Sequence, residues 1–118
     1  MKQRVGIARA LVSNPRVLLM DEPFSSIDEL TAEVLRKDVL SLLKGKDTSV
    51  KSVIMVTHNV EEAVELSDKI VVLSDKPSKV SAIRRIKLER PRNRRDSDFQ
   101  DAVDQIYSDL GRGTADIE

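Results

Sequence analysis

The sequence contains no cysteine, which excludes disulfide bonds and thiolate metal sites. Aromatic residues make up 3% of the chain, which argues against a stacking platform for single-stranded nucleic acid. Its 20 basic residues equal its 20 acidic residues, so net charge favours no polyanionic partner. No apolar run approaches the ~20 residues that a membrane-spanning helix needs. In 118 residues we expect at most one small domain, whose link to any membrane would go through a partner.

Three short apolar runs have the length and composition of strands. They are Val17–Met20, Val53–Val56 and Ile70–Leu73, and continuous apolar character predicts burial on both faces for the first two. A looser alternation over residues 80–88 predicts a hairpin partner or an edge strand. Helical spacing in the intervals between the runs predicts an α/β fold, with a mainly parallel sheet and crossover helices.

The helices are predicted from periodicity and from their caps. A first helix is expected over Lys2–Val12. Asp28 can cap the next one, and Asn59 with Glu62 three positions later predicts the start of a short third helix. The apolar stripe of the helix after Asp28 is Leu35, Val39, Leu42 and Leu43.

Along the last third of the chain, a basic stretch is followed by a mainly acidic one. The arginine-rich run from Arg84 to Arg95 is interpreted as a solvated linker, because no aromatic or glycine residues are interleaved as in a nucleic-acid patch. A capping-box pattern at Ser97 and Gln100 then predicts an amphipathic helix over Ser97–Leu110 that packs on the domain. Its apolar face consists of Phe99, Val103, Ile106, Tyr107 and Leu110.

Two of the predicted strands end in polar residues with related chemistry. Asp21 and Glu22 end the first, where one carboxylate can hold Mg²⁺ through its water shell and the other can orient an attacking water. Pro23 is expected to keep the backbone of Glu22 extended. His58 ends the second strand and would point into the same crevice, because ligands bind beyond the carboxyl ends of parallel strands. Each motif alone also fits an acidic loop or a surface histidine, but their coincidence favours a site.

These segments resemble the ATP-binding subunits of ABC transporters over nearly the whole chain. Met20–Pro23 resembles the end of their Walker B motif, Ser25–Asp28 their D-loop and Thr57–His58 their H-loop. Lys2–Leu11 is similar to the helix that directly follows their signature motif. Arg90–Gln100 looks like the end of the nitrate, sulfonate and taurine importer ATPases.

The resemblance implies a role for each matching residue. Asp21 would help hold Mg²⁺, Glu22 would be the catalytic base, and His58 would contact the γ-phosphate of ATP. Ser26 and Asp28 would belong to the D-loop at the interface of a subunit dimer. The cofactors implied are ATP and Mg²⁺. The partners implied are nucleotide, permease subunits and a second copy of the complete subunit, with no nucleic acid expected.

The fold that the resemblance implies is the C-terminal part of a P-loop NTPase domain over residues 1–88. Residues 89–118 would follow as a basic linker, a helix and a tail. The implied location is the cytoplasmic face of a prokaryotic cell membrane, reached through the permease.

The sequence also departs from the family's pattern. It has no G-x-x-x-x-G-K-[ST] loop to cradle phosphates, and the glutamine loop and the signature motif are absent too. We therefore expect a fragment of an importer ATPase that is inactive alone, from a system for a small anion or sulfur compound. Two alternatives stay open, a non-catalytic regulatory or interaction module and an ATPase of DNA repair or chromosome organisation. The second is disfavoured because no heptad coiled coil leads into the first helix.

Overall fold

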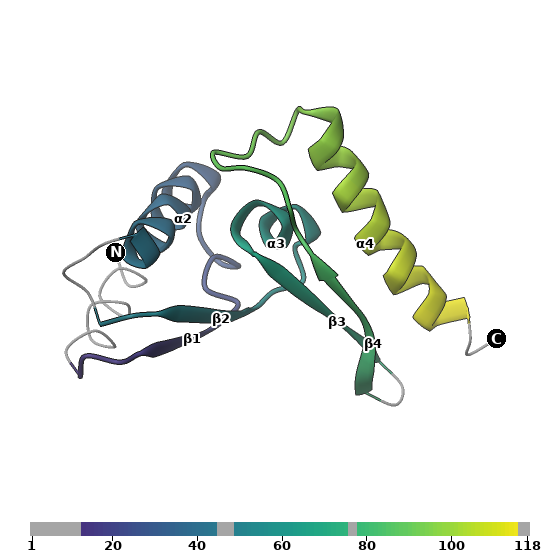
Figure 1. Ribbon diagram of the computed structural model, residues 1–118, viewed down its shortest axis with the longest axis horizontal. Helices are drawn as coiled ribbons and strands as arrows, with labels where there is room; N and C mark the ends of the chain where they lie inside the picture. The colour runs from purple at the N-terminus through teal and green to yellow at the C-terminus, as the bar shows by residue number, and fades with distance from the viewer. Residues whose placement is uncertain (1–12, 45–48, 76–77, 116–118) are drawn as a thin grey trace. The chain divides into compact units, whose positions relative to one another are not determined.

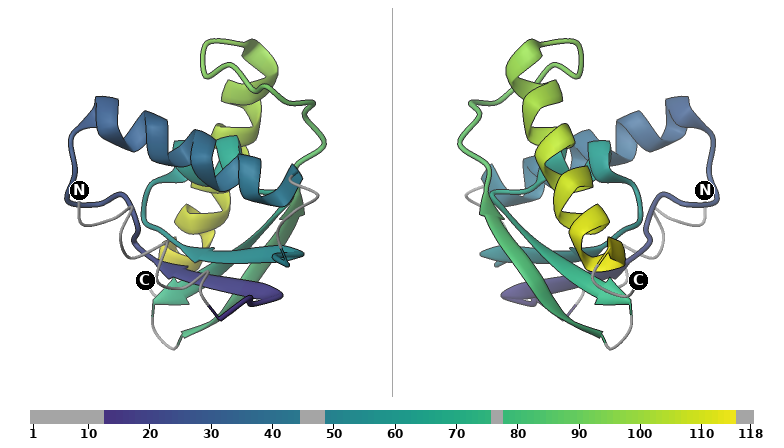
Figure 2. Two further views of the ribbon diagram at one scale, coloured as in Figure 1. Left: turned by 90° about the vertical axis from the view of Figure 1, so that its left-hand side faces the viewer. Right: turned by 90° about the vertical axis from the view of Figure 1, so that its right-hand side faces the viewer.

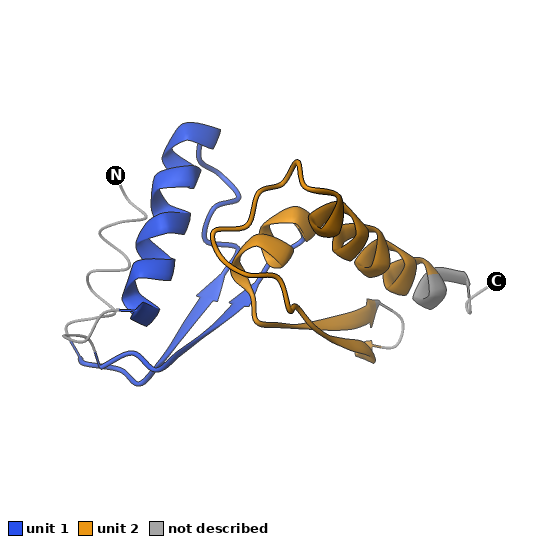
Figure 3. Ribbon diagram, turned by 45° about the horizontal axis from the view of Figure 1, so that its top comes forward, with its two compact units in different colours: residues 1–58 blue, residues 59–118 orange. Residues whose placement is uncertain are grey.

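The computed structural model describes residues 13–44, 49–75 and 78–115. The chain divides into two compact units, residues 1–58 and residues 59–118, which are shown in two colours in Figure 3 and are described separately below. The helix predicted over Lys2–Val12 lies outside the described residues. The functional boundary predicted at residue 88 stays a prediction.

The first unit contains a β–α–β crossover. Strand β1 (Val17–Asp21) pairs in parallel with β2 (Ser52–Val56), and helix α2 (Glu29–Lys44) connects them (Figure 1). The register places Asp21 opposite Val56, so the carboxyl ends of the two strands meet at one edge. The predicted parallel arrangement with a crossover helix is confirmed for this pair.

Helix α2 begins and packs as its sequence predicts. Asp28 caps it, because Oδ1 accepts the N–H of Thr31 at 2.9 Å and Oδ2 accepts the Thr31 hydroxyl at 3.0 Å. Leu35 and Val39 of the predicted stripe are buried, and the helix lies over one face of the strand pair (Figures 1 and 2). The cap and the stripe therefore fix the helix that returns the chain from β1 to β2.

Burial of the strand pair is one-sided, which corrects the expectation that both faces are covered. Leu18 and Met20 are buried, whereas Leu19 between them is 72% exposed. On β2, Ile54 and Val56 are exposed as well. Successive side chains of a strand point to opposite faces, and in the described part of this unit α2 covers one of them.

The second unit is built from two helices and a hairpin. Its elements are α3 (Val60–Leu66), β3 (Lys69–Asp75), β4 (Ser78–Arg85) and α4 (Ser97–Ala115). Strand β3 pairs with β4 in antiparallel fashion, which confirms the predicted hairpin, and α4 runs along the hairpin in both views of Figure 2. Among the described strands, β3 pairs with β4 alone, so the parallel sheet is limited to β1 and β2. No helix in the described ranges is long and apolar enough to cross a membrane.

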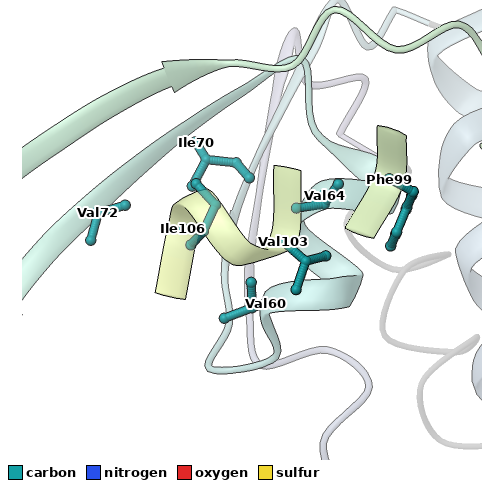
Figure 4. Packing of buried hydrophobic residues seen from close by; sticks show 7 residues of the cluster. All are labelled: Val60, Val64, Ile70, Val72, Phe99, Val103 and Ile106. Atoms are coloured by element: carbon teal, nitrogen blue, oxygen red, sulfur yellow. The ribbon is translucent and has the colours of Figure 1, made fainter. Parts of the chain in front are cut away.

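One apolar cluster joins α3, β3 and α4. It consists of Val60, Val64, Ile70, Val72, Phe99, Val103 and Ile106 (Figure 4). Tyr107 and Leu110 were predicted on the same face of α4 but are exposed, and Asp109 is buried instead. The reason is a partner on another element: Arg84 of β4 donates two hydrogen bonds of 2.8 Å to the Asp109 carboxylate.

The starts of the two helices in this unit differ in how well the sequence predicts them. The Asn59 cap of α3 is confirmed, because its Oδ1 accepts the N–H of Glu62 at 3.0 Å. The capping box at Ser97 is wrong. Ser97 is already the first residue of α4, and the N–H of Gln100 donates to the carbonyl of Asp96 at 3.1 Å. The helix therefore begins at Ser97, the first residue of the predicted range, but Asp96 and not Ser97 precedes its first turn.

The arginine-rich run does not behave as a solvated linker, which corrects that interpretation. Arg84 is paired with Asp109, and Arg90, Arg92 and Arg94 donate hydrogen bonds to carbonyl and carboxylate oxygens of the second unit. Each of these cations has at least one fixed acceptor within this unit, so the run is part of its packing.

Candidate functional site

The carboxyl ends of β1 and β2 bring the predicted polar residues to one edge of the strand pair. Asp21 ends β1, and the N–H of Glu22 donates to the carbonyl of Val56 at 2.8 Å. This bond extends the parallel hydrogen-bond pairing of β1 with β2 by one residue. His58 follows Val56 after a single intervening residue, so both strands deliver a functional side chain to the same edge.

Glu22 and His58 are in direct contact. With its proton on Nδ1, the imidazole of His58 donates to Oε1 of Glu22. The side chain of His58 is 94% exposed and that of Glu22 is 27% exposed, so the pair is open to a ligand from solvent. A carboxylate oriented by an imidazole is suited to accept a proton from a bound water. The two side chains, which the sequence predicts in one crevice, therefore lie in contact.

The backbone of Glu22 differs from the expectation. Its φ of 48° lies in the left-handed region, so the extended conformation expected before Pro23 is wrong. Three hydrogen bonds compensate for this conformation. The N–H of Glu22 donates to Val56, and its carbonyl accepts from the N–H of Ser25 at 3.4 Å and from the Ser25 hydroxyl at 3.1 Å. No sequence signal predicts such a turn, because glutamate before proline is normally extended.

The other predicted site residues, Asp21, Ser26 and Asp28, do not share the Glu22–His58 contact described above. Asp21 is exposed at the end of β1, and Ser26 is exposed in the turn that follows. Asp28 is engaged as the cap of α2. Its hydrogen bond from the Thr31 N–H, followed by that from the Thr31 hydroxyl, lowers the pKa of the Asp28 carboxyl below its ordinary value.

The acidic pair determines which metal ions this edge of the strand pair could bind. Among the residues that the structure describes, no group of three or more His, Cys, Asp or Glu side chains could hold a metal by itself. Mg²⁺, however, is usually bound through one or two carboxylates together with phosphate oxygens and waters. Asp21 can supply such a carboxylate, so it fits a magnesium ion that arrives with a nucleotide.

The parallel β–α–β crossover, with an acidic pair at the end of one strand and a histidine after the next, fits part of a P-loop NTPase fold. Comparison with known proteins then gives the family. Residues 1–25 match the ABC transporter family. The aliphatic sulfonates import ATP-binding protein SsuB of Bacillus subtilis is 40% identical over 100% of this chain and 45% of its own length. The chain belongs to the ABC transporter family.

Two further comparisons also match this chain to ATP-binding and transport proteins. The nitrate transport protein NasD of Klebsiella oxytoca is 46% identical over 80% of this chain and 35% of its own length. A dimeric post-hydrolysis structure of the ATP-binding cassette MJ0796 bound to ADP and Pi matches with a TM-score of 0.59 and 33% identity. That match covers 74% of this chain and 35% of the solved one. The chain thus spans less than half the length of the relatives that it matches.

Proposed function

We propose that this chain carries the hydrolytic residues of an ABC importer's ATP-binding subunit. The contact between His58 and Glu22 at the carboxyl edge of β1 and β2 is the observation that carries the proposal. In the complete subunit, ATP hydrolysis would drive import of a small anion or sulfur compound such as nitrate, sulfonate or taurine. The relatives named for sulfonate import and nitrate transport support this substrate class. Neither alternative left open by the sequence gains support from these relatives.

In this proposal Glu22 is the general base. Its carboxylate accepts a proton from the water that attacks the terminal phosphoryl group, and the left-handed backbone directs the side chain away from the strand. His58 orients that carboxylate through Nδ1. In the imidazolium form both ring nitrogens carry a proton, and Nε2 of the exposed ring can then also donate to an anionic phosphoryl oxygen. Asp21 would hold Mg²⁺ through water, and the bound ion would neutralise charge on the phosphate oxygens.

The proposed partners follow from the same assignment. Ser26 and Asp28 would lie at the interface of a dimer of the complete subunit, and the solved relative is dimeric. Permease subunits would bind the dimer and hold it at the cytoplasmic face of the cell membrane.

The test is steady-state phosphate release by the complete subunit that contains these residues. Glu22→Gln fills the same space but cannot act as a base, so we expect turnover to fall by ~10²–10⁴-fold while ATP binding persists. Glu33→Gln is the matched control, because Glu33 is an exposed residue of α2. A Glu22→Gln enzyme within about twofold of wild type would remove the assignment of the base.

A further inference from the structure

Helix α4 does not bury all of the apolar side chains that its sequence places on one face. Phe99, Val103 and Ile106 are buried in the apolar cluster of the second unit (Figure 4). Leu110 lies four positions after Ile106 and continues the same helical face, yet it is 40% exposed. Tyr107, on the flank of this face, is 55% exposed. Apolar burial alone therefore does not account for the orientation of the second half of α4.

Asp109 takes the buried place instead. Only 1% of its side chain is exposed. Its Oδ2 accepts a hydrogen bond of 2.8 Å from Nε of Arg84, and its Oδ1 accepts one of 2.8 Å from Nη2 of the same residue. The amide of Gln105, one turn earlier on α4, also donates to Oδ1 at 3.3 Å. The carboxylate is thus held from two elements, and the two-point contact with the guanidinium fixes its direction as well as its distance.

Arg84 departs from the apolar pattern of its own strand in the same way. Ala82 and Ile86, two positions to either side of it, are packed against the apolar cluster, and Arg84 lies between them in the same row. Ile70, its partner across the hairpin, is buried in the cluster. A cation in such a row is costly unless an anion meets it. Arg84 and Asp109 each interrupt an apolar face, and each finds its counter-charge in the other.

An alternative orientation of α4 would bury more apolar surface. Because successive residues of an α-helix differ in direction by about 100°, a turn of α4 that carries Asp109 toward solvent carries Leu110 and Tyr107 toward the hairpin. That orientation separates the ion pair and leaves Arg84 in the apolar row without its anion. Desolvation offsets much of the attraction within a buried ion pair, so such a pair adds little stability over apolar residues of similar size. Its effect is to disfavour every arrangement in which one charge is left alone.

We propose that the Arg84–Asp109 ion pair is a polar lock that selects the orientation of α4 on the hairpin and keeps Leu110 and Tyr107 at the surface. The lock acts within the second unit, and the inference does not depend on the proposed function. A pair with a purely stabilising role would leave the helix in the same orientation when it is removed.

The test uses the full chain with Tyr107 as a fluorescent probe, because the sequence contains one tyrosine and no tryptophan. We expect the double variant with Arg84→Ala and Asp109→Ala to place Tyr107 against the hairpin, so that its acrylamide quenching constant falls by about twofold or more. Arg84→Lys keeps the cation but loses the fork of donors, and should give an intermediate constant. The matched control combines Arg85→Ala with Asp104→Ala, which removes the same charges from exposed positions of β4 and α4 and should leave quenching unchanged.

The variants are compared on samples matched for oligomeric state by size-exclusion chromatography, because association also shields exposed rings. A lower quenching constant in the double variant, with the control unchanged, supports the lock. An unchanged constant, whether or not the melting temperature falls, would show that the pair does not set the orientation and would overturn the proposal. If the double variant loses its helical circular dichroism, Arg84→Gln gives the same decision, because it keeps a donor beside Asp109 but removes the cation.

Discussion

Glu22 combines a strained backbone with a functional side chain. A non-glycine residue in the left-handed region costs on the order of 1–3 kcal/mol and persists where the surroundings impose it. Here the hydrogen bond to Val56 and the turn closed by Ser25 impose it. The consequence is that the carboxylate meets the imidazole of His58 instead of continuing the alternation of β1. Strain at this residue is thus tied to the geometry that the proposed mechanism uses.

Asp28 provides a prediction about acid stability. Its pKa is lowered in the folded chain, so the ionised carboxylate stabilises α2 fully above the ordinary aspartate pKa, and this contribution is lost as the pH falls through the lowered value. Asparagine can still cap but cannot titrate. We expect Asp28→Asn to flatten the acid side of the stability curve and Asp28→Ala to lower the melting temperature at neutral pH as well.

Circular dichroism melts between neutral pH and about pH 2 are the measurement for Asp28. The matched control is Asp101→Asn, at an exposed position of α4. An Asp28→Asn chain with the acid dependence of the wild type would contradict the assignment of this cap.

At the scale of elements, the sequence predicts what depends on local pattern and fails where a second element decides. The crossover and the hairpin follow from apolar runs and alternation, and the structure contains both. Burial of Asp109 in place of Leu110 could not be predicted, because it depends on a guanidinium contributed by Arg84 of β4. The one-sided burial of β1 could not be predicted either, because a continuous apolar run does not reveal how many faces of a strand are covered.

In the candidate site, too, some features follow from local sequence pattern and others depend on contacts with a second element. Its residues could be placed at one edge from the strand ends alone, but the contact of Glu22 with His58 also depends on the turn at Glu22, which could not be predicted. The contacts that Arg90, Arg92 and Arg94 make could not be predicted either. Alternation of Arg90, Arg92 and Arg94 is visible in the sequence, but its meaning depends on the carbonyls of α3, which the fold alone brings within reach.

Helix α4 packs on the second unit through Phe99. Phe99 is 1% exposed in the cluster that joins α4 to α3 and β3 (Figure 4). Removing a buried phenylalanine side chain costs about 3–5 kcal/mol, and a buried carboxylate adds to that loss. We expect Phe99→Asp to unfold the second unit or lower its melting temperature sharply. Tyr107→Asp on the exposed face of the same helix should change little, and equal effects of the two variants would show that α4 does not pack through Phe99.

At the scale of the whole molecule, each unit leaves an apolar sheet face open. Leu19 and Ile54 lie opposite each other in register on the first unit, and Val71 with Ile83 does the same on the hairpin. Exposed apolar pairs of this kind favour association, because contiguous apolar surface is rare on soluble monomers. We therefore expect the isolated chain to be prone to self-association, which sets the concentration at which the experiments above are done.

The last prediction is that the chain by itself binds Mg-ATP weakly and does not hydrolyse it. Asp21, Glu22 and His58 can place a metal ion and a water, but they act on a phosphate that other groups must hold. In P-loop enzymes a glycine-rich loop, its lysine and the following helix N-terminus hold it, and the printed sequence has no G-x-x-x-x-G-K-[ST] pattern.

Two carboxylates would then face a polyanion whose charge only Mg²⁺ offsets. Calorimetric titration with Mg-ATP on a folded, monodisperse sample is the measurement, with a complete ATP-binding subunit of the same family as the positive control. Binding at about 1 μM corresponds to roughly −8 kcal/mol, which the site residues described here could not supply without a phosphate cradle. Saturable binding in that range would show that the chain forms a phosphate site of its own, and the assignment of its residues to hydrolysis alone would fail.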